Sequence, residues 1–121
     1  MRTDKLVYVC SPLRGNIEEN LENAKSYSKY VMKSGYIPFT PHLYFTTFLD
    51  DNIEEERTAG MQMGMEMLEK CDELWVMTNN ISEGMAKEIE WWIENKSKTT
   101  LYHMDLLYLR DIEGGLELSK K

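Results

Sequence analysis

Long apolar runs, cysteine, proline and positive charge are all scarce in this chain of 121 residues. No apolar stretch approaches the roughly 20 residues that cross a bilayer. The start, residues 1–5, leads into an apolar run of only about six residues, which is shorter than the core of a signal peptide. We therefore expect a cytoplasmic protein. The two cysteines, Cys10 and Cys71, lack the spacing of a metal site or a disulfide framework, and we interpret both as reduced and structural.

Positive charge is outnumbered, with 14 lysines and arginines against 21 acidic residues and a net charge of −7. A protein that binds the backbone of long nucleic acid relies on a basic surface, so that class is disfavoured. A small anion fits better, because backbone N–H groups and one or two arginines create a local positive site on an acidic protein. We predict neither a metal nor a cofactor.

Strand and helix patterns alternate along the chain. Strands are expected at residues 6–10, 36–40, 73–78 and 99–104. Helices are expected from Asn16 to Gly35 and at 53–70, 83–95 and 106–110. Pro38 lacks a ladder donor, so the second strand belongs at an edge. Residues 41–51 are expected to form a loop with one helical turn, Gly114 and Gly115 to break the last helix, and residues 119–121 to be loose.

This alternation indicates a parallel sheet with right-handed crossovers. We predict one α/β domain over residues 1–121, with a three-layer Rossmann- or flavodoxin-like fold, a mainly parallel sheet of four to five strands, and helices on both faces. Ligands of such folds bind beyond the carboxyl ends of the strands. Three loops are therefore the places to search, and they contain residues 11–15, His42 and residues 82–88.

The helix after the third strand begins with a polar cap. If Ser82 caps it, Gly84 lies in the first turn and Glu88 lies one turn further on the same face. Glu88 also falls at the edge of a buried stripe formed by Met85, Ile89, Trp92 and Ile93. A partly desolvated carboxylate would then face the same pocket as a helix N-terminus, an arrangement that holds an anionic sugar-phosphate beside a nucleophile or base.

Methionine is dense in the helix at 53–70. One face carries Met61, Met65 and Leu68, and a second carries Met63 and Met67. We interpret these side chains as flexible packing rather than metal ligands, since soft-metal sites usually add cysteine or histidine. The second face indicates a subunit interface and a homo-oligomer.

Two motifs in this order resemble the nucleoside 2-deoxyribosyltransferase superfamily, including its small branch that hydrolyses the N-glycosidic bond of nucleoside monophosphates. The first is Tyr-Val-Cys-Ser-Pro-Leu-Arg-Gly at residues 8–15. The second is Cys-Asp at 71–72, before the third strand, followed by Ser-x-Gly-x-x-x-Glu at 82–88. The resemblance covers residues 6–104 and implies a nucleoside or nucleoside 5′-monophosphate as substrate.

The resemblance implies that Glu88 is the nucleophile that attacks the anomeric carbon and forms a covalent glycosyl-enzyme, with the Tyr8 hydroxyl directed toward the site. The residues that it implies for the phosphate or the sugar are Ser11, Arg14, Gly15, Ser82 and Gly84. Each role has an ordinary alternative: a surface ion pair for Glu88, core packing for Tyr8, a solvated loop for Arg14, and helix capping for Ser82 and Gly84.

Two further side chains have open roles. His42 follows the second strand, where a base or sugar would reach it, and it exchanges protons near neutral pH; an ordinary loop histidine is the alternative. Arg57 either completes an anion site or forms a salt bridge on the helix surface.

The sequence departs from the superfamily pattern in two places. A carboxylate is expected in the helix before the third strand, but the nearest position is Met65, with Glu66 beside it, so the acid that protonates the leaving group is unassigned. The usual Glu-x-Gly continuation is also absent, because Trp91 follows residues 88–90. A non-catalytic nucleotide-binding or sensing protein is therefore an alternative, and an assembly protein built on the methionine and tryptophan surfaces is a third. The base, the sugar, the need for phosphate and the choice between hydrolase and transferase stay open.

Overall fold

The computed structural model describes residues 4–104. Its elements are, in chain order, β1 (Leu6–Cys10), α1 (Ile17–Lys33), β2 (Ile37–Phe39), α2 (Pro41–Phe45), α3 (Glu54–Lys70), β3 (Glu73–Val76), α4 (Glu83–Asn95), the 3₁₀ turn η1 (Lys98–Thr100) and β4 (Leu101–His103). The helix expected at 106–110, the break at Gly114 and Gly115, and the expected loose end lie outside the described residues.

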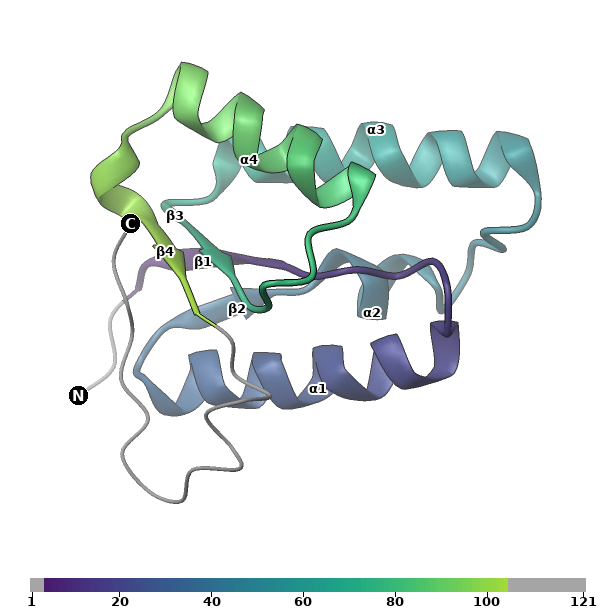
Figure 1. The fold of residues 1–121 in the computed structure, drawn as a ribbon, viewed down its shortest axis with the longest axis horizontal. Helices are drawn as coiled ribbons and strands as arrows, with labels where there is room; N and C mark the ends of the chain where they lie inside the picture. Colours follow the sequence, from purple (N-terminus) through teal and green to yellow (C-terminus); the bar gives the residue numbers. More distant parts are fainter. Residues whose placement is uncertain (1–3, 105–121) are drawn as a thin grey trace.

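The four strands form one parallel sheet in the order β2-β1-β3-β4. Helix α1 covers one face, while α3 and α4 lie together over the other (Figure 1). The predicted three-layer α/β fold is therefore confirmed. Strand β2 lies at an edge of the described sheet, as Pro38 requires, because proline donates no hydrogen bond to a ladder.

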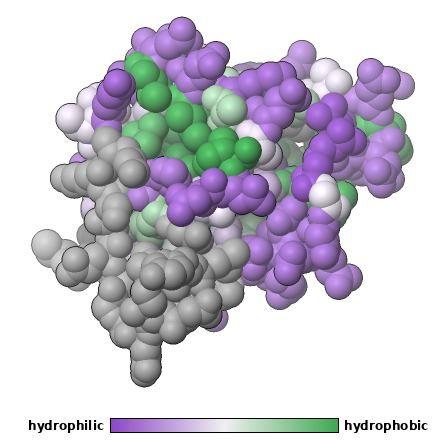
Figure 2. Space-filling model, viewed as in Figure 1, coloured by the Kyte–Doolittle hydropathy of each residue, from purple (hydrophilic) through white to green (hydrophobic). Residues whose placement is uncertain are grey.

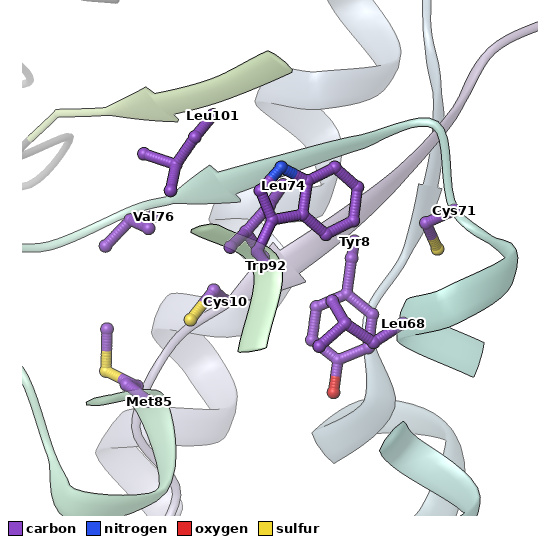
Figure 3. Packing of buried hydrophobic residues seen from close by; sticks show 9 residues of the cluster. All are labelled: Tyr8, Cys10, Leu68, Cys71, Leu74, Val76, Met85, Trp92 and Leu101. Carbon is purple, nitrogen blue, oxygen red and sulfur yellow. The ribbon is translucent and has the colours of Figure 1, made fainter. Parts of the chain in front are cut away.

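The core divides into two clusters because successive side chains of a strand point to opposite faces of the sheet. The cluster under α1 contains Val7, Val9, Tyr27, Val31, Trp75, Met77 and Met104. The cluster under α3 and α4 contains Tyr8, Cys10, Leu68, Cys71, Leu74, Val76, Met85, Trp92 and Leu101 (Figure 3). Strands β1 and β3 are covered on both sides, which explains their nearly continuous apolar sequences.

Both predicted helix caps are present. The side chain of Asn16 accepts a hydrogen bond from the backbone N–H of Glu19, at 3.1 Å, and Ser82 Oγ accepts one from Met85 N–H, at 3.2 Å. Gly35 follows the end of α1 with a φ of 96°, a left-handed conformation that glycine adopts without a steric penalty. These contacts confirm the helix ends that the sequence predicts at Asn16, Gly35 and Ser82.

Three local expectations need correction. Strand β3 ends at Val76 rather than at 78: the Met77 N–H reaches the carbonyl of Cys10, the last residue of β1, and the ladder stops there. Residues 99–100 belong to η1, so the last strand begins at Leu101. Ile93 is 42% exposed rather than buried, because it lies about 80° around the helix from Met85.

The described residues on the face of the molecule drawn in Figure 2 are mainly hydrophilic, and the hydrophobic ones gather beside α4. None of the helices described over residues 4–104 is long and apolar enough to cross a membrane.

On α3, Leu68 is buried, Met63 and Met67 are partly exposed, and Met61 is 43% exposed. The subunit interface expected on Met63 and Met67 stays a prediction.

Candidate active site

A cavity of about 340 Å³ is bounded by α2, α3, the start of α4 and the loops that follow β1, α2 and β3. The three segments expected to surround a ligand, which contain residues 11–15, His42 and residues 82–88, all contribute to it. The predicted residues that line the cavity are Tyr8, Ser11, Arg14, His42, Ser82, Gly84 and Glu88. Gly15 lies outside the lining, and its φ of 102° accounts for glycine there through backbone conformation alone.

Glu88 has both carboxylate oxygens held by side chains of β1. The Tyr8 hydroxyl donates to Oε2 at 2.5 Å, and the Cys10 thiol donates to Oε1 at 3.3 Å. Burial raises the pKa of Glu88 from its usual 4.5 to about 7, while these two hydrogen bonds act in the opposite direction. The Glu88 carboxylate therefore lies in the cavity wall, hydrogen-bonded to β1, rather than in an ion pair on the surface.

The Tyr8 hydroxyl is a donor over the whole physiological pH range. Burial, followed by the neighbouring Glu88 charge, raises the Tyr8 pKa well above its usual value. The ring of Tyr8 packs against Phe39, with the ring centres 5.9 Å apart. Tyr8 thus has a packing role at its ring and a hydrogen-bonding role at its hydroxyl.

His42 stands in α2 and is anchored to the loop after β1. Its Nε2 lies 2.8 Å from the carbonyl oxygen of Ser11, which only accepts, so Nε2 carries the hydrogen. Burial lowers the pKa of His42 below its usual 6.5, so the ring is neutral at pH 7 and Nδ1 holds a lone pair. A neutral histidine is a poor source of a proton for a leaving group.

Ser11 carries an unsatisfied hydroxyl in the wall of the cavity. The residue is 2% exposed, and its Oγ has no hydrogen-bond partner within residues 4–104. A buried polar group without a partner costs roughly 1–3 kcal/mol. Ser11 is also one of the residues that line the cavity.

The start of α4 presents backbone and hydroxyl donors to the same cavity. Ser82 Oγ accepts from Met85 N–H as a cap, and its own hydrogen is still available to a ligand. A Cβ built on Gly84 would meet no atom of the described residues within 4 Å. Packing within the protein therefore does not require glycine at position 84. Close approach of a ligand to the N–H groups of the first helical turn would require it.

Arg14 and Arg57 converge on one carboxylate that the sequence analysis did not single out. Asp51 receives Arg14 Nε at 3.0 Å on one oxygen and lies 4.0 Å from Arg57 Nε at the other. All three residues line the cavity. Arg57 does form an ion pair, although its partner lies in the loop before α3 rather than on the helix itself. Only the tertiary fold brings these three segments together.

Gly64 of α3 lies close to the Tyr8 hydroxyl. A Cβ built on Gly64 would lie 3.3 Å from the Tyr8 hydroxyl oxygen, whereas Met65 packs against the core cluster and also lines the cavity. The carboxylates that line the cavity besides Glu88 are Asp51, Glu56 and Glu83. Asp51 is paired with arginine, and Glu56 accepts from the backbone N–H of Asp50 at 2.7 Å.

The fold and the cavity define a parallel α/β protein with a ligand-sized pocket at the carboxyl ends of its strands. The chain belongs to the family described as a domain of unknown function, DUF7768, whose sequence model matches residues 5–102. No curated protein sequence matches it. Among solved structures it is similar to a 2-deoxyribosyltransferase from the psychrotolerant bacterium Bacillus psychrosaccharolyticus, described as a biocatalyst for nucleoside synthesis. The two share 16% sequence identity over 92% of each chain, with a TM-score of 0.62. This likeness establishes a common fold.

Proposed function

We propose that this protein cleaves the N-glycosidic bond of a nucleoside or nucleoside 5′-monophosphate, or transfers its (deoxy)ribosyl group, through a covalent intermediate on Glu88. The observation that carries the proposal is the partly buried carboxylate held at both oxygens by Tyr8 and Cys10 in the wall of a ligand-sized cavity. The fold shared with a 2-deoxyribosyltransferase supports it.

The chemistry follows from the carboxylate. A carboxylate oxygen of Glu88 forms a bond to the anomeric carbon as the bond to the base nitrogen breaks, and the bonding electrons leave with the base, which takes up a proton. In hydrolysis, water then attacks the anomeric carbon, releases the sugar and regenerates the carboxylate. In transfer, a second base takes the place of water. With a pKa of about 7, Glu88 is ionised in about half of the molecules at neutral pH.

A 5′-phosphate would be bound at the start of α4. Ser82 supplies a hydroxyl, the open space at Gly84 admits the phosphate to the backbone N–H groups, and the buried Ser11 hydroxyl offers another polar contact. Arg14 would add positive charge from the opposite loop. Such a site would let a chain of net charge −7 bind an anion.

A matched pair of variants on α4 tests the proposal. Glu88→Gln keeps the shape of the side chain and removes the nucleophilic charge, so release of free base from a panel of nucleosides and nucleoside monophosphates should fall by at least a hundredfold. Glu90→Gln changes an exposed carboxylate on the same helix and should release base at the parent rate. Equal base release by Glu88→Gln and the parent would rule out Glu88 as the nucleophile.

Binding without turnover is the second candidate function, and Gly64 favours it. The position on α3 that faces Tyr8 carries no acid, so no dedicated proton donor for the departing base stands there. Such a protein would bind nucleoside monophosphates in calorimetry and release no base from any of them. Free base in the same samples would exclude this candidate.

A further inference from the structure

Cys10 contacts the proposed nucleophile directly. It lies two residues after Tyr8 on β1, so both side chains project from the same face of the strand toward α4 (Figure 3). Cys10 is fully buried, and its Sγ lies 3.3 Å from Glu88 Oε1, while Tyr8 holds Oε2. A single strand therefore supplies one donor to each carboxylate oxygen.

We propose that Cys10 is a positioning residue for Glu88: its thiol holds Oε1 while Tyr8 holds Oε2, which fixes the carboxylate in one orientation and favours its ionised form. The inference deepens the proposed function, since it assigns a residue that prepares the nucleophile. It goes beyond the purely structural interpretation of Cys10 made from the sequence.

The protonation state of the thiol is suited to this role. Burial, and next the charge of Glu88, raise the pKa of Cys10 well above its usual value, so it stays an S–H donor at neutral pH. The hydrogen bonds from Tyr8 and from Cys10 each lower the Glu88 pKa against the larger effect of burial. The other titratable side chains that line the cavity are Arg14, His42, Asp51, Glu56, Arg57, Glu83 and Lys87.

Core packing alone is the competing explanation, because a buried cysteine is often only a small apolar side chain. The two explanations differ in what they predict for Glu88. If Cys10 only fills space, its replacement changes stability and leaves the titration of Glu88 unchanged. If Cys10 positions Glu88, replacement changes that titration according to the donor strength of the new side chain.

The test measures the titration of Glu88 itself, by NMR of protein labelled with ¹³C in the glutamate side-chain carboxyl, with Glu88→Gln to assign the signal. Cys10→Ala removes the donor, and the Glu88 pKa should rise by about half to one unit, since a thiol is a weaker donor than a hydroxyl. Cys10→Ser supplies a stronger donor of similar size, and the pKa should fall below that of the parent. Cys71→Ala, at the other buried free cysteine, should leave it unchanged.

Titration curves for Cys10→Ala and Cys10→Ser that coincide with the parent curve would overturn the proposal. If Cys10→Ala does not fold, Cys10→Ser alone decides, because it keeps the donor and nearly the same volume. The measurement needs no turnover, so an absence of base release would refute the proposed function and leave the positioning role standing. Where the enzyme is active, the acid limb of its pH profile should move in the same direction as the titration.

Discussion

At the scale of single residues, the Tyr8 hydroxyl makes the shorter of the two hydrogen bonds that hold the Glu88 carboxylate. Tyr8→Phe keeps the ring against Phe39 and removes only the 2.5 Å hydrogen bond to Glu88. A hydrogen bond to a charged group contributes about 1.5–3 kcal/mol, which corresponds to a rise of roughly one to two units in the Glu88 pKa. The acid limb of kcat/KM against pH should therefore move to higher pH, and the rate at pH 7 should drop about tenfold or more.

Tyr27→Phe is the matched control for this prediction. Tyr27 is equally buried but lies in the cluster on the opposite face of the sheet. Its replacement tests the general cost of removing a buried phenolic hydroxyl, and the pH profile should keep its shape. A profile for Tyr8→Phe that matches that of Tyr27→Phe would contradict the role assigned to the Tyr8–Glu88 hydrogen bond.

At the scale of elements, α4 carries two functions at one end. Ser82 caps the helix, and we propose that it also contacts the ligand anion, whereas Asn16 caps α1 in the same way and lies outside the cavity lining. Ser82→Ala and Asn16→Ala should each lower the free energy of unfolding by about 1 kcal/mol. Only Ser82→Ala should also weaken nucleoside monophosphate binding, by about fivefold or more in calorimetry.

The two measurements on this pair separate the two roles of the cap. Equal loss of affinity in both variants would mean that general destabilisation, rather than a contact from Ser82, weakens binding. Unchanged affinity in Ser82→Ala would remove Ser82 from the ligand site and leave it with its capping role alone.

Helix caps and the parallel arrangement of the strands were accessible from the sequence because their causes are local. Ser82 and Asn16 satisfy N–H groups three residues away, and alternating apolar runs predict a parallel sheet without reference to distant residues. The contact between Cys10 and Glu88 spans 78 positions, and no local pattern encodes it. Asp51 was missed for the same reason, since its partner Arg14 stands 37 positions away.

The packing of α3 against β1 is a second feature that the sequence did not indicate. Met65 is the position where the superfamily pattern expects a carboxylate, and it lines the cavity together with Gly64. A Cβ built on Gly64 would lie 3.3 Å from the Tyr8 hydroxyl oxygen. Glycine at that point lets α3 approach the Tyr8 hydroxyl, and this close approach becomes visible only when both elements are in place.

At the scale of the whole molecule, the elevated pKa of Glu88 links the site to the stability of the fold. The folded protein holds a proton on Glu88 up to about pH 7, whereas the unfolded chain releases it near the usual 4.5. The folded state therefore binds more protons between these values, and the free energy of unfolding falls as pH rises through this window. The shift corresponds to a loss of up to roughly 3 kcal/mol at about 1.4 kcal/mol per unit.

Glu88→Gln removes this titration, so its stability relative to the parent should increase from about pH 5 to about pH 7 and level off at higher pH. Urea unfolding at several pH values measures the difference, in which the titrations of all unchanged groups cancel. The change of this stability difference with pH is diagnostic. Its absolute size is not, because the amide also changes the hydrogen bonds with Tyr8 and Cys10. Glu90→Gln, which changes an exposed carboxylate on the same helix, is the matched control. A pH-independent difference for Glu88→Gln would mean that the fold does not hold this carboxylate in its less ionised form, and the acid limb expected near pH 7 would then need another residue.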